Sequence, residues 1–233
     1  MDIGYIKSLW RYPVKSLGGE AVETLEFDER GAISDRMFAM LTGDGKLGSG
    51  KNTRRFSQID GLLSLSAAIT SEGVKISFPY GETLTARDSS LNTRLSEYLG
   101  QSVRMVRENQ ISHLDDGAVH LITSRVLTSL KDELPDVDID ERRFRPNIVI
   151  ETTCSDDDLV GNELLIGDIA LHVTHKTERC RMIMLEQSGI ENQPKLLKTV
   201  SKKYDLQFGV YASVSSPGTI SVGNKVELFS KTI

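Results

Sequence analysis

The stretch LHVTHKTERCRMIML, residues 171–185, continues a strand pattern that begins at residue 163 and contains the most informative residue of the chain, Cys180. Cys180 lies between Arg179 and Arg181, and Lys176 is four residues upstream. Positively charged neighbours favour the thiolate, the form of cysteine that binds metals or attacks electrophiles. Two interpretations follow: Cys180 is a metal ligand served by other basic motifs, or it is a small buried apolar residue on a strand.

The other cysteine, Cys154, begins the acidic run CSDDD at residues 154–158, where negative charges disfavour a thiolate. Two cysteines in such different surroundings predict no disulfide framework, so we expect a reducing, cytoplasmic location. The first residues also lack the pattern of a signal peptide.

The composition is that of a soluble globular protein. The 233 residues are 39% hydrophobic and 26% charged, and this length is enough for one large core or two small ones. No apolar run approaches the roughly 20 residues of a membrane-spanning helix, so no membrane partner is expected. A net charge of −5 argues against nucleic acid as the main partner. The lysines and arginines nevertheless gather in short motifs, as expected for a local anion site.

Short β-prone segments separated by turns dominate the first hundred residues and predict a mainly β fold. Glycine-containing turns such as GDG at residues 43–45, Glu72-Gly73 and Tyr80-Gly81 connect them in the manner of hairpins. Many short strands at this spacing predict a barrel or a sandwich. The predicted strands cover residues 3–14, 21–27, 36–41, 62–69, 74–78 and 83–86.

A helix is predicted over residues 91–99, where leucines recur at positions 91, 95 and 99. A serine at position 89 or 90 can cap its start, and Gly100 can end it. The polar stretch 109–117 is the best candidate for a break between two halves of the chain.

The second half is predicted to mix strands with two helices. Thr123 can cap a helix with apolar residues at 126, 127 and 130, which ends before Pro135. A later helix covers residues 195–204, with Pro194 in its first turn. The predicted strands cover residues 148–150, 163–173 with a turn at 167–168, 208–214, and 219–229 with an interruption at 223–224.

Two short motifs of the first half offer donors for an anion. In YPVKS, residues 12–16, Lys15 and Ser16 follow a rigid turn, and both can donate to a phosphate oxygen. A solvated loop lysine is the simpler interpretation. Asp35 and Arg36 open a strand, and an isolated pair of this kind is usually structural.

The sequence GKLGSGKN, residues 45–52, nearly matches the phosphate-binding loop of nucleotide hydrolases. Asn52 lacks the hydroxyl that holds magnesium in that motif, and no helix pattern follows. A nucleotide hydrolase is therefore not favoured. The glycine-rich hairpin, with Lys51, Arg54 and Arg55, can still contact an anion.

The motif RRFRPN, residues 142–147, concentrates positive charge before a strand. On an extended backbone, Arg143 and Arg145 point to one face and Arg142 to the other. Adjacent guanidiniums need an anion between them, or carboxylates such as those of the acidic stretch 136–141. Arg145 and Asn147 would share a face and offer a grip for a phosphate or a polar heterocycle.

Other catalytic classes find little support. A zinc site from His172, His175 and Cys180 is not favoured, because residues three apart on a strand point to opposite faces. No serine occupies a recognisable nucleophile elbow, so hydrolase chemistry has no local support.

In their order along the chain, these motifs resemble the MOSC family, the molybdenum cofactor sulfurase C-terminal domain preceded by its N-terminal β-barrel domain. The resemblance extends to the mitochondrial amidoxime-reducing components and similar bacterial proteins. The matching segments are YPVKS (12–16), Gly31 to Arg36, more loosely SGK (49–51), RFRPNIVI (143–150), ELLIGD (163–168), Arg179-Cys180, FGVY (208–211) and GTISVG (218–223).

The resemblance implies a role for each matching residue. Cys180 would be the catalytic ligand of molybdenum in the Mo-molybdopterin cofactor, and no pyridoxal phosphate is implied. Thr123 and Ser124, at a helix start, would bind the cofactor phosphate, which suits the free N–H groups there. Tyr211 and Glu178 would lie near the cofactor. The pterin and its phosphate would be held by Lys15, Ser16, Arg36, Arg145 and Asn147.

Two departures from the family pattern concern the entrance of the site. Gly161 stands about where the family commonly carries a tryptophan. Thr177-Glu178 stands where relatives often have small or basic residues before the cysteine. The substrate side of the site is therefore less well defined than the cofactor side.

The implied fold is mainly β with inserted helices, of the β-barrel type. An N-terminal β-barrel domain (1–110, including the helix 91–99) would pack on a MOSC domain (111–233). The implied activity is molybdenum-cofactor-dependent reduction of small N-hydroxylated compounds. Since the chain has no cysteines for an iron–sulfur cluster, a flavoprotein reductase, a ferredoxin-like or a cytochrome b5-like protein would supply electrons. The alternative is a non-catalytic carrier that holds sulfur or the cofactor through Cys180.

Overall fold

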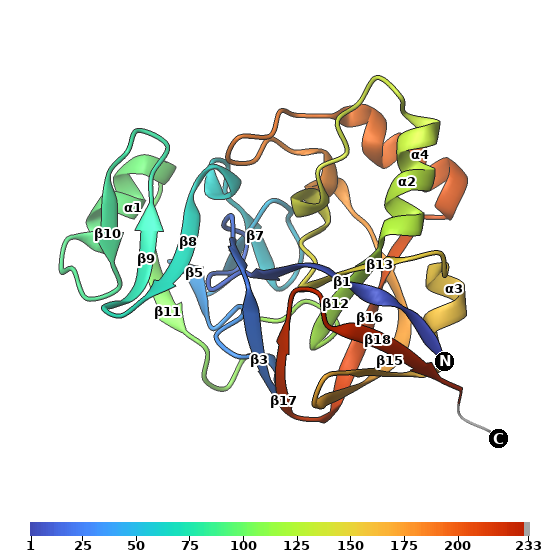
Figure 1. Ribbon diagram of the computed structural model, residues 1–233. Coiled ribbons are helices and arrows are strands. Elements are labelled where there is room, and N and C mark those ends of the chain that lie inside the picture. Colours follow the sequence, from blue (N-terminus) through green and yellow to red (C-terminus); the bar gives the residue numbers. More distant parts are fainter. Residues whose placement is uncertain (231–233) are drawn as a thin grey trace.

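The computed structural model describes residues 1–230 and shows a mainly β fold built around a closed barrel of seven strands (Figure 1). β1 closes the barrel because it pairs with β13 on one side and with β18 on the other. β12 and β13 run parallel, whereas the other barrel pairs are antiparallel. The predicted mainly β, barrel-type fold is confirmed. In hydrogen-bonded order the barrel strands are β1 (Asp2–Arg11), β13 (Ile148–Thr152), β12 (Val119–Thr123), β16 (Gln207–Ser216), β15 (Ile169–Glu178), β14 (Glu163–Ile166) and β18 (Lys225–Phe229).

Aliphatic side chains fill the barrel. Alternate residues of a strand point to opposite faces, so in β14 Leu164 and Ile166 are fully buried while Leu165 is exposed. Ile6 of β1 and Leu171 of β15 join the same core. Burial of each such side chain stabilises the fold by about 1.5–3 kcal/mol.

A smaller lobe, at the left of Figure 1, contains most of the first hundred residues. The leucines of α1 at 91, 95 and 99 are buried in its core, and Gly100 ends the helix with a φ of 65°. The predicted helix is confirmed, although Ser90 makes no capping bond with its side chain. The elements of the lobe are β5 (Phe38–Thr42), β6 (Leu47–Ser49), β7 (Phe56–Gln58), β8 (Ser66–Thr70), β9 (Gly73–Ser77), β10 (Thr83–Thr85), α1 (Leu91–Leu99), β11 (Val103–Arg107) and the 3-10 turn η1 (Leu62–Ser64).

The remaining elements surround the barrel. α2 (Ser124–Glu133) and α4 (Pro194–Tyr204) pack over its outer face, and their buried residues share a core with Phe144 and Phe208. The others are β2 (Glu20–Val22), β3 (Thr24–Asp28), β4 (Gly31–Ala32), α3 (Asp156–Leu159), β17 (Gly218–Ser221) and the 3-10 turns η2 (Glu141–Phe144) and η3 (Arg181–Met184).

Two predicted strands are divided in the structure. Residues 62–69 begin with the turn η1, because the consecutive Leu62 and Leu63 are both buried and a strand would send them to opposite faces. Residues 21–27 divide at Glu23, because β2 pairs with β1 whereas β3 pairs with β17.

The sheet hydrogen bonds cross the predicted domain boundary. β1, from the first residues of the chain, completes the barrel formed by strands after residue 118, and β17 pairs with β3. The domain division at residue 110 stays a prediction. Strands from each half of the sequence pair with strands from the other half.

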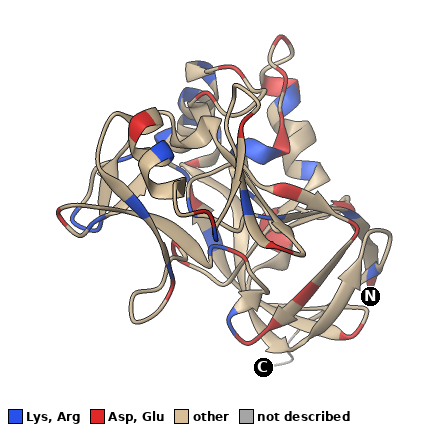
Figure 2. Cartoon of the chain, turned by 90° about the vertical axis from the view of Figure 1, so that its left-hand side faces the viewer, with Lys and Arg blue, Asp and Glu red and all other residues tan. Residues whose placement is uncertain are grey.

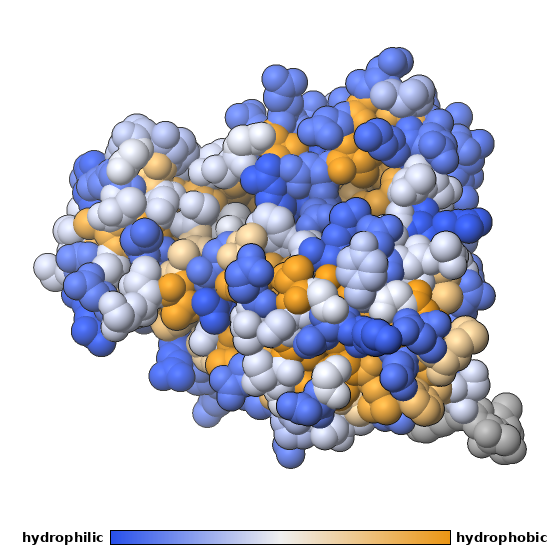
Figure 3. All heavy atoms as spheres, in the orientation of Figure 1, coloured by the Kyte–Doolittle hydropathy of each residue, from blue (hydrophilic) through white to orange (hydrophobic). Residues whose placement is uncertain are grey.

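The face seen in Figure 3 is largely hydrophilic, with apolar side chains near its lower centre, over β17 and β18. Val222 follows β17 and Phe229 ends β18, and these two residues are 39% and 44% exposed. Across residues 1–230, no helix is both long and apolar enough to span a bilayer.

Candidate functional site

A cavity of about 310 Å³ lies between the barrel and the smaller lobe. The barrel contributes His120 of β12, Glu178 of β15 and Tyr211 of β16. The lobe contributes Ser49 of β6 and Phe56 of β7. Elements far apart in the sequence therefore meet here, at a size in the usual range for small-molecule sites.

Positive charge dominates the lining of this cavity. Six cationic side chains face it, against three carboxylates, although the whole chain carries a net charge of −5. Figure 2 shows Lys and Arg segments near the centre of the molecule as well as on its surface. The cations are Lys15, Arg36, Lys51, Arg143, Arg145 and Arg179, and the carboxylates are Asp115, Asp116 and Glu178.

Cys180 is half-buried and lines the cavity. It lies two residues after the end of β15 and directly before the turn η3, where its carbonyl accepts from Ile183 N at 3.3 Å. It belongs to none of the hydrophobic clusters among the described residues, whereas Cys154 packs against the barrel core and does not line the cavity. The structure thus distinguishes the two thiols by their surroundings.

Lys15 is buried, with 2% of its surface exposed, so its interpretation as a solvated loop lysine is wrong. Its Nζ donates to the His113 carbonyl at 3.0 Å and to Asp115 Oδ1 at 2.6 Å. It also lies 4.7 Å from the centre of the Phe56 ring. Burial lowers the pKa of Lys15 to about 8, although Asp115 acts in the opposite direction. Ser16 lies beside it in the cavity lining.

Asp115 and Asp116 were missed as site residues because the stretch 109–117 was interpreted only as a linker. Burial acts to raise the pKa of Asp115, but the Lys15 ammonium outweighs it and lowers the pKa to about 2. Asp116 Oδ2 lies 2.9 Å from His175 Nε2. The available sequence signal for these site residues was a pair of adjacent acidic residues in a stretch with few apolar residues.

Arg36 combines a structural and a site position. It forms a buried ion pair with Asp35, and its Nη2 donates to the Arg145 carbonyl at 3.1 Å. The expected structural pair is present, and Arg36 also lines the cavity.

The backbone of residues 142–147 is not extended, contrary to what the prediction assumed, although Arg143 and Arg145 do reach one side and Arg142 another. Residues 141–144 form the turn η2, and Arg145 follows with a φ of 55°. The turn lets Arg143 and Arg145 both reach the cavity, while Arg142 pairs with Asp140 at 2.5 Å. The acidic stretch thus serves as the counter-charge of Arg142.

The Arg145 side chain is held by one hydrogen bond to a main-chain carbonyl and by one cation–π contact. Its Nη1 donates to the Leu17 carbonyl at 2.6 Å, and its guanidinium lies 4.3 Å from the centre of the Tyr12 ring. Burial, and then the nearby Arg36, lower the pKa of Arg145 to about 10. Its Nη2 has no hydrogen-bond partner in the part of the chain that the structure describes.

Arg179, His120 and Tyr211 form another wall. Arg179 Nη2 donates to the Phe144 carbonyl at 2.5 Å, and its Nη1 lies 3.5 Å from His120 Nε2. Burial, and then Arg179, hold the pKa of His120 well below its ordinary value, so the ring is neutral near pH 7. The Tyr211 ring packs at 5.4 Å from that of His120. His120 was missed because histidines were considered only as zinc ligands and not as neutral hydrogen-bond acceptors.

Asn147 lies at the edge of the site. It lines a small adjoining cavity together with Arg36, His120 and Tyr211. Its Oδ1 accepts from the His120 main-chain N–H at 3.1 Å. Asn147 therefore lines the adjoining cavity and not the main one.

Thr123 and Ser124 do not line the cavity. Thr123 caps α2, as predicted, since its Oγ1 accepts from Val126 N at 3.3 Å, and it donates to Asp156 Oδ1 at 3.3 Å. Ser124 Oγ bonds the main chain of Thr152. The structure brings eight of the ten predicted residues, Glu178 among them, to the two adjoining cavities and leaves these two outside.

Within the described residues 1–230, four buried polar atoms of the lining lack a hydrogen-bond partner: Arg143 Nε, Arg145 Nη2, Thr177 Oγ1 and Arg179 Nε. Such atoms are costly in a protein interior, so they suit an anionic ligand rich in acceptors. In the part of the chain that the structure describes, no cluster of three His, Cys, Asp or Glu side chains could hold a metal. A metal beside Cys180 would therefore need ligands from a cofactor, and a phosphorylated pterin dithiolene fits these donors.

Two family models match this chain and together cover most of it. Residues 108–227 match the family model of the MOSC domain, and residues 3–128 match that of the MOSC N-terminal beta barrel domain. The mitochondrial amidoxime-reducing component 1 of Mus musculus is 26% identical, over 99% of this chain and 84% of its own length. A molybdenum cofactor sulfurase of Drosophila mojavensis is 32% identical over 52% of this chain, which is 17% of that protein.

Among solved structures, the YUAD protein from Bacillus subtilis has a similar fold. The TM-score is 0.57, and the match covers 98% of this chain and 97% of that one at 15% identity.

Proposed function

The chain belongs to the MOSC domain family, and we propose that it is a molybdenum-cofactor-dependent reductase of N-hydroxylated compounds that receives electrons from a partner protein. The similarity to amidoxime-reducing components over almost the whole chain supports this substrate class. The observation that carries the proposal is the position of Cys180 in a cation-lined cavity with unpartnered donors.

The lining residues fit the cofactor as follows. Arg145 Nη2 and Arg179 Nε would donate to its anionic groups, and Lys15, Ser16 and Arg36 would add charge and hydrogen bonds. Cys180 would bind the molybdenum through its thiolate. The cofactor, when bound, supplies the two-electron redox chemistry, while the protein supplies position and electrostatics.

The overall reaction breaks the N–O bond, takes up two electrons and two protons, and releases water. Lys15, whose pKa burial lowers to about 8, can hold or release a proton near neutral pH. Asp115, its partner at 2.6 Å, has a side chain that is 45% exposed and connects Lys15 to solvent. The two cysteines of this sequence are too few to ligate an iron–sulfur cluster, and in the proposed function a partner protein brings the electrons.

The proposal predicts stoichiometric molybdenum and pterin in protein purified from a host that makes the cofactor. With an artificial electron donor, this protein should reduce benzamidoxime to benzamidine. Cys180→Ser should abolish turnover, because a neutral hydroxyl does not replace the thiolate, whereas Cys154→Ser is the matched control and should retain it. Protein without molybdenum and pterin, or with full activity in Cys180→Ser, would contradict the proposal.

A second candidate is a non-catalytic carrier of sulfur or of the cofactor through Cys180. The similarity to molybdenum cofactor sulfurases favours it, and the match with them covers about half of this chain. A half-buried thiol can also present a bound group to another protein. Bound cofactor or cysteine persulfide without any reductase turnover would support the carrier instead of the enzyme.

A further inference from the structure

We propose that Glu178 makes this site selective for N-hydroxylated compounds that carry a positive charge, such as N-hydroxyguanidines, over neutral ones such as benzamidoxime. This inference rests on the proposed reductase function and names the substrate class of the same cavity.

Glu178 lies beside the reacting region. It is the last residue of β15, lines the cavity and precedes Cys180 by two residues. Its neighbours Thr177 and Arg179 are buried, whereas Glu178 is exposed. Its side chain therefore belongs to the solvent-exposed part of a cavity lining that also includes Cys180.

Glu178 differs from the other two carboxylates of the cavity because its charge has no direct partner. Asp115 forms an ion pair with Lys15 at 2.6 Å, and Asp116 lies 2.9 Å from His175. Within residues 1–230, Glu178 takes part in no ion pair and no side-chain hydrogen bond. A cationic ligand could therefore pair with the Glu178 carboxylate without first displacing another cation.

The charges of the cavity are divided between its depth and its rim. The unpartnered donors belong to buried arginines, Arg143 and Arg179, and to the buried face of Arg145. An anionic cofactor bound by these donors would neutralise the deep positive charge. The exposed carboxylate of Glu178 then remains to attract a guanidinium or amidinium group and to form a charge-assisted hydrogen bond with it.

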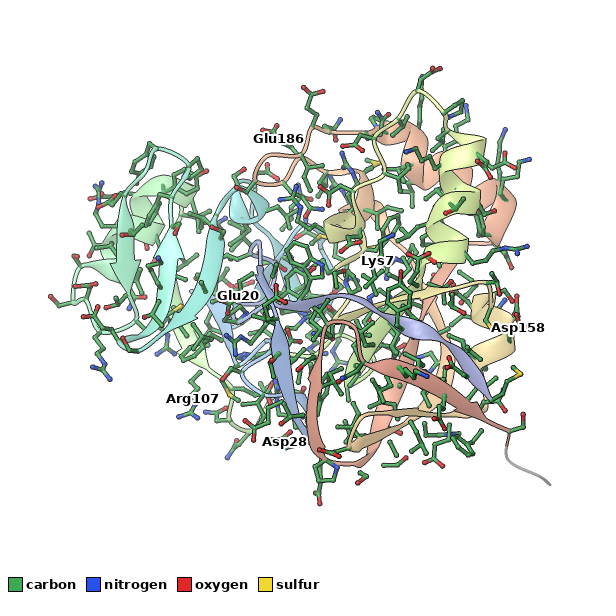
Figure 4. All side chains as sticks on the ribbon, viewed as in Figure 1. Lys7, Glu20, Asp28, Arg107, Asp158 and Glu186 are labelled. Carbon is green, nitrogen blue, oxygen red and sulfur yellow. The ribbon has the colours of Figure 1, made fainter. Side chains whose placement is uncertain are left out.

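The test compares two substrates in cofactor-loaded protein with an artificial electron donor. The ratio of kcat/KM for an N-hydroxyguanidine to that for benzamidoxime should fall about fivefold in Glu178→Gln, which is the upper range for an exposed charge pair. Glu178→Lys should lower the ratio further. The matched control is Glu186→Gln, an exposed carboxylate that does not line the cavity and is labelled at the upper edge of Figure 4, and it should leave the ratio unchanged.

A binding measurement provides a readout apart from turnover. Calorimetric titration of cofactor-loaded protein with benzamidine, a cation at neutral pH, should show about fivefold weaker binding in Glu178→Gln than in the unaltered protein. An unchanged substrate ratio together with unchanged benzamidine affinity overturns the role of Glu178, even if benzamidoxime is reduced. Absence of any reduction, with molybdenum and pterin present, contradicts the proposed function instead, and the titration still tests Glu178.

Discussion

At the scale of single residues, Lys15 places a buried positive charge in the site, and this burial reduces the stability of the fold. Its ammonium is almost completely removed from water, and burial lowers its pKa to about 8 from the ordinary 10.5. The nearby Asp115 reduces this cost but does not cancel it. A lysine kept in such a place is consistent with a binding role, because a hydrophobic residue would stabilise the fold more.

The Lys15 environment predicts how stability depends on pH. Between about pH 8 and 10.5 the unfolded chain binds more protons at this lysine than the folded protein does, so its contribution makes the folded state more stable as the pH rises. Relative to Lys15→Met, the free energy of unfolding of the unaltered protein should rise by up to about 3 kcal/mol across this window.

Denaturant titrations at several pH values would measure this difference. Lys176→Met is the control, since Lys176 pairs with Asp157 at 2.5 Å on the surface and should show no such trend. A constant difference between the unaltered protein and Lys15→Met from pH 8 to 10.5 would show that Lys15 is not desolvated.

At the scale of elements, a buried carboxylate connects α2, α3 and β16. Asp156, at the start of α3, accepts from Gly209 N at 2.8 Å and from Thr123 Oγ1 at 3.3 Å. Burial raises the pKa of Asp156. Thr123 therefore has a structural role as cap and partner, and it lies outside the cavity lining.

This arrangement predicts that Thr123→Val reduces stability without reducing cofactor content. The substitution removes the cap of α2 and one partner of Asp156, and it should lower the free energy of unfolding by about 2 kcal/mol. Thr128→Val, at an exposed position of the same helix, is the control for the loss of a hydroxyl. Thermal unfolding and molybdenum analysis would measure both effects, and a clear loss of molybdenum in Thr123→Val would assign the residue to the cofactor.

At the scale of the whole molecule, the first strand of the chain completes the barrel of the last strands. Ile6 and Leu9 of β1 are buried in the barrel core, and β1 is hydrogen-bonded to both β13 and β18. The cavity also needs both parts, because its lining comes from the barrel and from the smaller lobe. The MOSC half therefore depends on the beginning of the chain for its fold and for its site.

We accordingly predict that residues 111–233 do not fold alone. Without β1, the edges of β13 and β18 are unpaired, and the barrel loses the burial of Ile6 and Leu9. Circular dichroism of this fragment should show no cooperative thermal transition, whereas the full chain shows one. A cooperative transition in the fragment would mean that the barrel closes by another route.

Local patterns predicted much of the fold and part of the site. The helix 91–99 followed from three leucines at helical spacing and a terminal glycine, and YPVKS and Arg179-Cys180 were recognised as motifs. The bent backbone at Arg145 could not be predicted, because its φ of 55° is maintained by contacts from distant residues, such as Arg36 to its carbonyl. The contacts of His120 and Asp115 could not be predicted either, since their partners are 59 and 100 residues away.

The sequence by itself determined the strand and helix signals, the family resemblance and the choice of Cys180 over Cys154, because these depend on side-chain chemistry within a few residues. The tertiary structure alone decided which basic residues share a cavity with Cys180, that Thr123 and Ser124 stay outside it, and that Glu178 keeps an unpaired charge. The physical reason is that burial and pairing depend on strands brought together across the closed barrel and the smaller lobe, and local sequence does not specify these contacts.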